Sequence, residues 1–245
     1  HALHVFDARH RAYFVIKDAG KEELISPIGI AVDEEGAVYV SDSMLKKVFV
    51  FDTKGKYVRQ IGSADTFARP AGVTLGGDKV YVVDTHGHHV SVFNKSDGKF
   101  LFRFGKNGTA AGEFNYPTNI FAGKDDLLYI TDSLNFRVQI FDKNGQWVGS
   151  FGKQGNGSGD FSKPKGIAVD SEGHIYVADA DFDVVQIFDR EGRLLLAFGN
   201  AGRAAGQMVL PAGVFIDDED RIYVADSYNN RIQLFQYLPQ KKESK

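Results

Sequence analysis

Short apolar runs separated by turn residues recur along the chain. In residues 164–199 the runs are GIAV, HIYVA, VVQIF and LLLAF, separated by turn sequences such as DSEG and DREG. Each run is about as long as a β-strand, and no segment of the sequence shows the 3.6-residue periodicity of an amphipathic helix. The pattern therefore predicts an all-β protein built from units of four antiparallel strands.

One such unit recurs five times, opened by a proline and with an aspartate at the end of its second strand. The prolines are Pro27, Pro70, Pro117, Pro164 and Pro211, and the aspartates are Asp42, Asp84, Asp132, Asp179 and Asp226. Successive prolines are 43, 47, 47 and 47 residues apart. A four-stranded sheet cannot cover its own faces, so the units must pack on one another. This period with four strands per repeat indicates the blades of a β-propeller.

The repeated sequence carries a family resemblance. PxGIAVDxxGxIYVADxxxxxVQIFDxxGxxxxxFG resembles the NHL repeat, and residues 211–235 match it best. The resemblance implies a toroidal β-propeller, usually of six blades, that most often acts as a binding platform. We therefore expect one propeller over residues 1–238, with repeats at 27–69, 70–116, 117–163, 164–210 and 211–238, and a polar tail at 239–245.

The first 26 residues bear on the number of blades. HVFD and the segment 13–17 match the third and fourth strands of a unit, since Asp7 aligns with Asp52. We expect six blades, with residues 1–26 supplying the outer strands of an incomplete first blade whose inner strands lie upstream of His1. Five blades are the alternative, but that arrangement leaves HVFD as a strand with unpaired edges.

Composition limits the partners. The formal net charge of −3 does not provide the broad basic surface of a non-specific nucleic-acid binder. The sequence has no cysteine, which excludes disulfides, cysteine nucleophiles and a CxxCH attachment for a haem of its own. No apolar run reaches membrane-spanning length. A protein partner is therefore expected, rather than a nucleic acid or a membrane.

Residues shared by all units are expected to build the fold, because a chemical site needs particular groups only once. We expect the strand-ending aspartates to accept hydrogen bonds from the backbone or from a neighbouring blade. The loops between blades repeat GxxGxxxGxF. Their glycines are expected to adopt positive φ, and Phe114 and Phe161 to pack between blades, with Met208 at the same place in the last loop.

Residues that differ between units are better functional candidates. The loops between second and third strands read SMLKK, THGHH, SLNFR, ADFDV and SYNNR, and in a propeller they share one face, here called the rim. Aromatic side chains among charges are typical of a protein-recognition surface, although a merely solvated rim is the alternative. The rim candidates are Lys46, Lys47, His86, His88, His89, Phe136, Arg137, Asp181, Phe182, Asp183, Tyr228 and Asn229.

Two further sites have weaker support. Neutral imidazoles bind zinc or copper, and His86 and His88 stand at alternate positions, although the loop THGHH itself contains no carboxylate. Asn119 replaces a glycine at the mouth of the predicted channel, where an ion, a small ligand or water could bind. Related propeller families include lactonases with channel calcium and a zinc-dependent peptidyl-hydroxyglycine lyase, but the inner strands here offer few such ligands. No cofactor is expected.

These observations favour a non-enzymatic scaffold that docks a protein through the rim. The sequence contains no HExxH, GxSxG or Walker motif. A metal-dependent enzyme of the lactonase or lyase type is the alternative, and an RNA-binding NHL domain ranks third because the rim mixes basic residues with Asp181 and Asp183. The chain also resembles bacterial extracytoplasmic NHL-repeat proteins, some of which occur alongside multihaem cytochromes, and this implies a periplasmic, secreted or surface-anchored location.

Overall fold

The computed structural model describes residues 2–7 and 11–237. They belong to two compact units, residues 1–150 and 151–245. The described residues of both units form antiparallel sheets joined by turns, with two short 3-10 helices as the only helical segments. None of these helical segments is long and apolar enough to cross a membrane.

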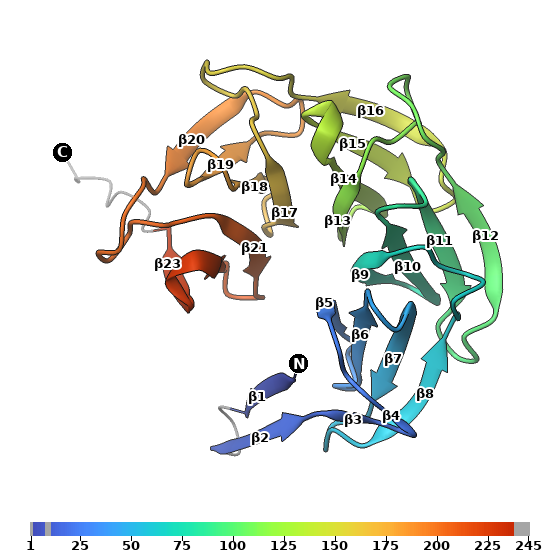
Figure 1. Ribbon diagram of the computed structural model, residues 1–245. Coiled ribbons are helices and arrows are strands. Elements are labelled where there is room, and N and C mark those ends of the chain that lie inside the picture. Colours follow the sequence, from blue (N-terminus) through green and yellow to red (C-terminus); the bar gives the residue numbers. More distant parts are fainter. Residues whose placement is uncertain (1, 8–10, 238–245) are drawn as a thin grey trace. The chain divides into compact units, whose positions relative to one another are not determined.

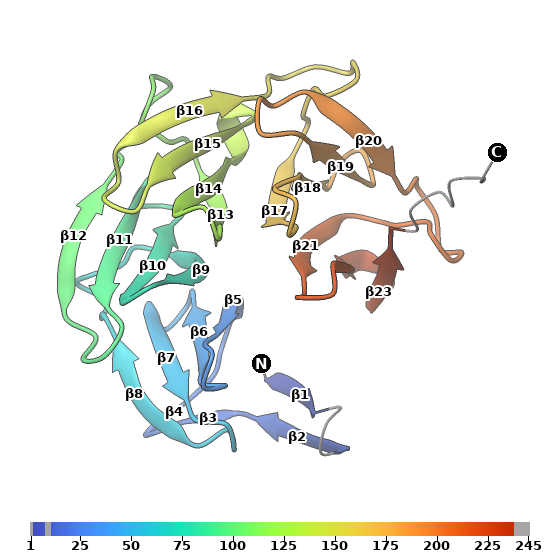
Figure 2. The ribbon, with the colours of Figure 1, turned by 180° about the vertical axis from the view of Figure 1, so that it is seen from behind.

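The first unit contains three four-stranded sheets (Figure 1). Their strands are β5 (Pro27–Val32), β6 (Val38–Asp42), β7 (Lys47–Phe51) and β8 (Tyr57–Ile61); β9 (Pro70–Gly76), β10 (Lys79–Asp84), β11 (His89–Asn94) and β12 (Phe100–Phe104); and β13 (Pro117–Ala122), β14 (Leu127–Asp132), β15 (Arg137–Asp142) and β16 (Trp147–Phe151). The 3-10 helix η1 (Ser133–Asn135) joins β14 to β15. In each sheet the strands lie in chain order, with β5, β9 and β13 innermost (Figures 1 and 2).

The N-terminal segment forms a separate small sheet in this unit. Strand β1 (Leu3–Asp7) pairs with β2 (Ala12–Ile16), with Leu3 opposite Ile16. A short hairpin of β3 (Asp18–Ala19) and β4 (Glu22–Glu23) follows. Leu3, Val5 and Phe14 pack on the core that contains Phe49. HVFD is therefore part of a paired strand.

The second unit contains one four-stranded sheet and one three-stranded sheet. The strands are β17 (Pro164–Val169), β18 (Ile175–Asp179), β19 (Val184–Phe188) and β20 (Leu194–Phe198), then β21 (Pro211–Ile216), β22 (Arg221–Asp226) and β23 (Arg231–Gln236), with η2 (Ser227–Asn229) between β22 and β23. Figure 2 shows β17 beside β21, the two inner strands, which are in contact. The prediction of four-stranded antiparallel blades is confirmed: the described residues form four such sheets, a fifth of three strands and the β1–β2 pair.

Alternate residues of one strand belong to two different cores. Val80 and Val82 of β10 lie in the core shared with the β5–β8 sheet. Tyr81 and Val83 of the same strand lie in the core shared with the β13–β16 sheet. The period-2 geometry of a strand sends successive side chains to opposite faces, so a run of apolar residues such as VYVV suits a sheet that is covered on both faces. This packing explains why a single four-stranded repeat would not fold alone.

Glycine permits the close approach of the inner strands. A Cβ atom on Gly72 of β9 would lie 2.7 Å from the Cα atom of Asn119 in β13. In the second unit, a Cβ atom on Gly166 would lie 2.8 Å from the Cα atom of Gly213. Any larger residue would force these neighbouring strands apart.

Candidate functional site

The five turns between second and third strands share one backbone conformation. Their fourth residue has a positive φ, between 52° and 57°, although none of the five is glycine. These residues are Lys46, His88, Phe136, Asp183 and Asn230. The first turn residue is buried in four of the turns, and the second is exposed in all five. Turn position therefore decides which rim side chains face solvent.

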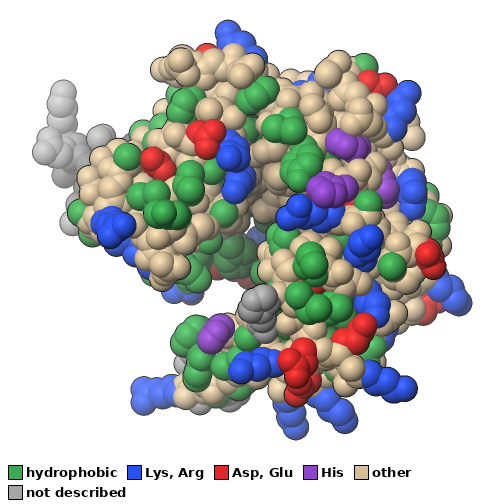
Figure 3. All heavy atoms as spheres, in the orientation of Figure 1, with side chains coloured by type: hydrophobic (Ala, Val, Ile, Leu, Met, Phe, Trp, Pro, Cys, Tyr) green, Lys and Arg blue, Asp and Glu red, His purple; other side chains and the backbone are tan. Residues whose placement is uncertain are grey.

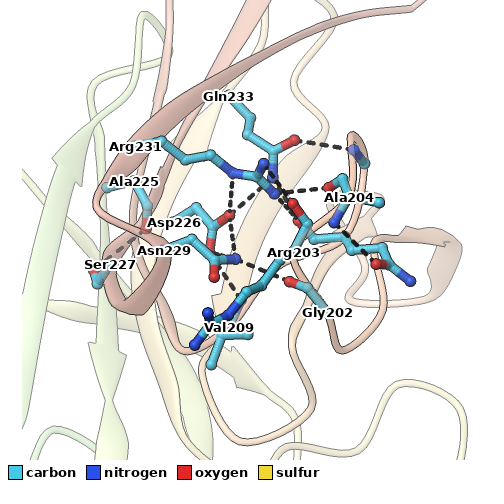
Figure 4. Close-up of polar contacts among 12 residues, drawn as sticks. Gly202, Arg203, Ala204, Val209, Ala225, Asp226, Ser227, Asn229, Arg231 and Gln233 are labelled. Carbon is cyan, nitrogen blue, oxygen red and sulfur yellow. Dashed lines mark hydrogen bonds and ion pairs between the residues drawn. The ribbon is translucent and has the colours of Figure 1, made fainter.

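A buried aspartate organises each turn, and Asp226 in the second unit illustrates the arrangement (Figure 4). Its carboxylate accepts hydrogen bonds from the backbone N–H of Val209 at 2.8 Å, from Nδ2 of Asn229 at 2.9 Å, from Nε of Arg231 at 2.8 Å and from Nε2 of Gln233 at 3.1 Å. Because Val209 belongs to the preceding loop, the carboxylate joins that loop to the turn. The expected structural role of the repeated aspartate is thus confirmed.

Several rim candidates take part in the same internal bonding. Arg137 donates from Nε to Asp132 and from its guanidinium to the carbonyl oxygens of Ala110 and Glu113. Asn229 donates to the carbonyl oxygen of Gly202 at 2.9 Å. These two side chains hold the glycine-rich loops in place, and their polar groups face the protein.

Two further candidates, Lys47 and His89, occupy in their own sheets the position that Arg137 has in the β13–β16 sheet. Lys47 forms an ion pair with Glu22 at 2.6 Å. His89 is buried, and its Nδ1 atom lies 2.8 Å from the carbonyl oxygen of Gly87. Burial lowers the pKa of His89, so its imidazole is neutral at pH 7.

His88 and Asp183 perform the same structural function in different units. The backbone N–H of Tyr116 donates to Nδ1 of His88 at 3.1 Å, and that of Leu210 donates to Oδ1 of Asp183 at 2.8 Å. Tyr116 and Leu210 have positive φ values of 59° and 51°. Each of them directly precedes the proline that opens the next sheet, so the rim side chain fixes the entry of that sheet's first strand.

The two histidines considered as metal ligands both form hydrogen bonds with Tyr116. Nε2 of His86 lies 2.9 Å from the Tyr116 hydroxyl, and the two rings are 5.4 Å apart. His88 accepts the backbone N–H of the same tyrosine. Within residues 2–7 and 11–237, no three His, Cys, Asp or Glu side chains lie close enough to share a metal ion.

Asn119 lies half-buried on the inner strand β13. Its backbone N–H donates to Oγ1 of Thr131 at 3.0 Å, and its Oδ1 accepts the backbone N–H of Ile120 at 2.9 Å. Gly72 of β9 packs against it. Within the first unit the asparagine therefore helps to join β9, β13 and β14, and its proposed role toward a ligand stays a prediction.

The second turn position is the one at which all five rim turns have an exposed side chain. Met44 is 66%, Leu134 49% and Tyr228 65% exposed, and His86 and Asp181 occupy the same position in the other two turns. Figure 3 shows hydrophobic side chains next to histidine and basic side chains on the face that it displays. Lys46, Phe136 and Phe182 are only half-buried, at other turn positions.

Sequence reasoning named His86, Asp181 and Tyr228 but missed Met44 and Leu134. Both missed residues stand two positions after the strand-ending aspartate, as Tyr228 does. Aligning the loops by turn position, instead of judging them by residue type, would have found them. Asp181 is also tied locally, with Lys163 at 3.6 Å and the Ser162 hydroxyl at 3.3 Å.

The buried aspartates differ in whether a positively charged side chain faces the carboxylate, and their pKa values differ accordingly. Burial raises the pKa of Asp179, even though the backbone N–H groups of Ser162 and Lys163 donate to its carboxylate. Burial also acts to raise the pKa of Asp226, but hydrogen bonds from Val209, Asn229 and Arg231 outweigh it and hold that pKa below its ordinary value. The difference follows from the partner strand, because Val184 pairs with Asp179 where Arg231 pairs with Asp226.

Val184→Arg is expected to supply the missing countercharge. A raised carboxyl pKa means that stability falls as the pH rises through the folded-state pKa of Asp179. An arginine at position 184 should lower the pKa of Asp179 below its ordinary value. It should also add about 1–2 kcal/mol to the free energy of unfolding at neutral pH. This gain is lost as the pH falls through the ordinary carboxyl pKa of 3.8, and it disappears below the lowered folded-state pKa of the variant, where the aspartate is protonated in both the folded and the unfolded state.

Urea denaturation at a series of pH values measures this gain. Val184→Met is the matched control, because it adds similar length without charge. Equal stabilisation by methionine and arginine, or a gain from arginine that does not change with pH, would show that charge pairing is not responsible.

Comparisons with known proteins agree with this architecture. A family model described as a 6-bladed beta-propeller matches residues 3–65, 67–127 and 122–185. A second family model, the NHL repeat, matches residues 209–235.

Solved structures show the same fold at low sequence identity. Virginiamycin B lyase from Staphylococcus aureus is 15% identical, with a TM-score of 0.69 over 98% of this chain and 78% of that one. An auxiliary nutrient binding protein from Bacteroides ovatus is 13% identical, with a TM-score of 0.71 over 95% of this chain and 63% of that one. The WD40 propeller domain of Doa1 is 14% identical, with a TM-score of 0.67 over 94% and 67% of the two chains. At these identities the likeness concerns the fold alone.

The family model covers most of the chain, and the NHL model covers the greater part of the last sheet. The sheets also follow the repeats of the sequence. The chain therefore belongs to the 6-bladed beta-propeller family and is an NHL-repeat propeller.

Proposed function

We propose that this protein is a non-enzymatic scaffold that docks a partner protein through the exposed second positions of its rim turns. The observation that carries the proposal is the exposure of large apolar side chains there. Met44, Leu134 and Tyr228 are each about half or more exposed. Apolar and aromatic side chains on a firm surface are what protein interfaces use as anchors.

The backbone of the rim supports such a role. Each turn is held by a buried aspartate, and in the first unit Asp132 accepts hydrogen bonds from Asn115, Asn135 and Arg137. A backbone fixed in this way loses little conformational freedom when a partner binds. The variable residues therefore set specificity while the shared residues keep the turn in shape.

The charge of the rim favours protein over RNA. Two of the basic rim candidates are already neutralised within the first unit, Lys47 by Glu22 and Arg137 by Asp132. This lowers the positive charge available to phosphate groups, which dominate affinity for nucleic acids. The likeness to a lyase concerns the fold, and no specific observation favours an enzymatic role. The extracytoplasmic location expected from the family resemblance is part of the proposal.

Site-specific photo-crosslinking tests the proposal. A photoreactive residue at position 134 should capture a discrete partner from the native host, which is then purified to measure its affinity. Met44→Ser with Leu134→Ser is expected to weaken binding at least ~ten-fold, because two exposed anchors are lost.

The matched control is Val58→Ser with Val148→Ser, which removes two apolar side chains of similar exposure from the outer strands β8 and β16. It should leave affinity unchanged. Equal affinities for the rim variant and the control variant would rule out this surface.

A further inference from the structure

A hollow of about 140 Å³ lies in the first unit, at the strand ends opposite the rim. It opens between the β9–β10 turn and the β13–β14 turn of the neighbouring sheet. Gly76 and Gly77 border it on one side, and Ala122 and Leu128 on the other. Tyr81 and Lys143 complete its wall.

A departure from the repeat creates this space. The sixth position after the opening proline is aspartate in three repeats, Asp33, Asp170 and Asp217, but glycine in two, Gly76 and Gly123. In the second unit the aspartate accepts a hydrogen bond from the tyrosine hydroxyl of the same sheet, from Tyr176 at 3.2 Å and from Tyr223 at 3.1 Å.

Tyr81 has no such aspartate and reaches across to the next sheet. Its hydroxyl donates to the carbonyl oxygen of Lys143 at 3.0 Å. A Cβ atom on Gly76 would lie 3.2 Å from the Tyr81 ring and 3.4 Å from Cβ of Ala122, so a side chain there would enter the hollow. A Cβ atom on Gly77 would have no atom within 4 Å.

The lining of the hollow is mostly apolar. Leu128 and Tyr81 are buried, and Ala122 lies beside them. Burial, with the nearby carboxylates of Asp78 and Asp126, raises the pKa of Tyr81 to about 12, so its phenol is neutral at pH 7. A dry apolar cavity of about 150 Å³ holds a benzene molecule. The space thus suits an apolar group of about that size.

The mouth carries two charges of each sign. Lys79 pairs with Asp78 at 3.1 Å on one side, and Lys143 pairs with Asp126 at 3.1 Å on the other. Both carboxylates are largely exposed. Ion pairs in such exposed positions contribute little free energy, so a ligand with its own charges can replace one partner of each pair at low cost.

We propose that this hollow binds a free amino acid with an apolar side chain of about benzene size. The side chain occupies the space beside Ala122 and Leu128. The α-ammonium group faces a carboxylate at the mouth, and the α-carboxylate faces a lysine. A molecule with only one of these charges leaves one pairing unused.

Calorimetric titration of the whole chain with L-phenylalanine tests the proposal. Comparison probes are 2-phenylethylamine, which lacks the carboxylate, and 3-phenylpropanoate, which lacks the ammonium group. L-phenylalanine should bind ~two- to five-fold more tightly than either, because each lacks one charge that pairs with an exposed group at the mouth. Equal affinity for all three probes, or no binding of L-phenylalanine at millimolar concentration, would overturn the proposal.

Two variants locate the binding. Gly76→Asp restores the residue found in three other repeats and fills the hollow, and Ala122→Leu fills it from the neighbouring strand. Each is expected to weaken binding at least ~ten-fold. Gly149→Asp is the control, since it makes the same substitution where the added Cβ meets no atom within 4 Å. Unchanged binding in both filling variants would place the ligand elsewhere and contradict the assignment.

Discussion

Asp132→Asn is expected to lower the free energy of unfolding by about 3–5 kcal/mol, because it leaves a buried charge without its partner. The carboxylate is fully buried and accepts hydrogen bonds from Asn115, Asn135, Arg137 and Gln139 at 2.7–3.0 Å. Asparagine removes the charge that faces the Arg137 guanidinium, which is itself only 14% exposed. Its amide N–H₂ would also face other donors.

Urea denaturation followed by the fluorescence of Trp147 measures this loss, since the chain has a single tryptophan and it lies in the first unit. Glu34→Gln is the control, as an exposed acid whose replacement should change stability by no more than about 0.5 kcal/mol. In the double variant with Arg137→Met, the loss in the free energy of unfolding should be smaller than the sum of the losses in the two single variants. A loss below about 1 kcal/mol in Asp132→Asn would contradict the role assigned to its charge.

The strands and the role of the aspartates were predictable because both depend on local sequence. Runs such as VYVV alternate faces within one strand, and the turn residues that bound them act over two to four positions. The repeat makes each such signal appear several times. As a result, the four-stranded sheets lie within the repeats that the prolines mark, and each strand-ending aspartate accepts the backbone hydrogen bonds expected of it.

The distribution of exposed and internal residues on the rim was not predictable in the same way. His88 and Asp183 looked like variable surface residues, but their partners Tyr116 and Leu210 are 28 and 27 residues away, at the start of the next sheet. A single sequence does not show that histidine and aspartate accept equivalent backbone N–H groups. The positive φ of Lys46 and Phe136 was not predictable either, because neither residue is a glycine.

The sequence indicates only one of the two features that form the hollow. The two glycines, Gly76 and Gly123, that replace the aspartate of three other repeats can be read from the sequence. The space itself depends on Tyr81 turning to the Lys143 carbonyl, a contact between residues 62 positions apart. Local patterns therefore indicate where the repeat changes, whereas the outcome of the change depends on packing between sheets.

Phe114→Ala is expected to be as destabilising as the loss of the buried charge, by about 3–5 kcal/mol, because it leaves a cavity in a core that cannot collapse. The ring is fully buried, lies 5.4 Å from the ring of Phe141 and belongs to the core between the β9–β12 and β13–β16 sheets. The turn is built around it, since a Cβ atom on Gly105 would lie 2.5 Å from the ring.

Phe114→Met provides the matched comparison, because the second unit places Met208 at the same point of its loop, also fully buried. A volume-conserving change of this kind should cost less than about 1.5 kcal/mol. Urea denaturation of the three proteins at one pH gives both differences. If alanine and methionine destabilise equally, the ring contributes through its aromatic contacts and not by filling the space between sheets. If neither destabilises, the loop does not help to join the two sheets.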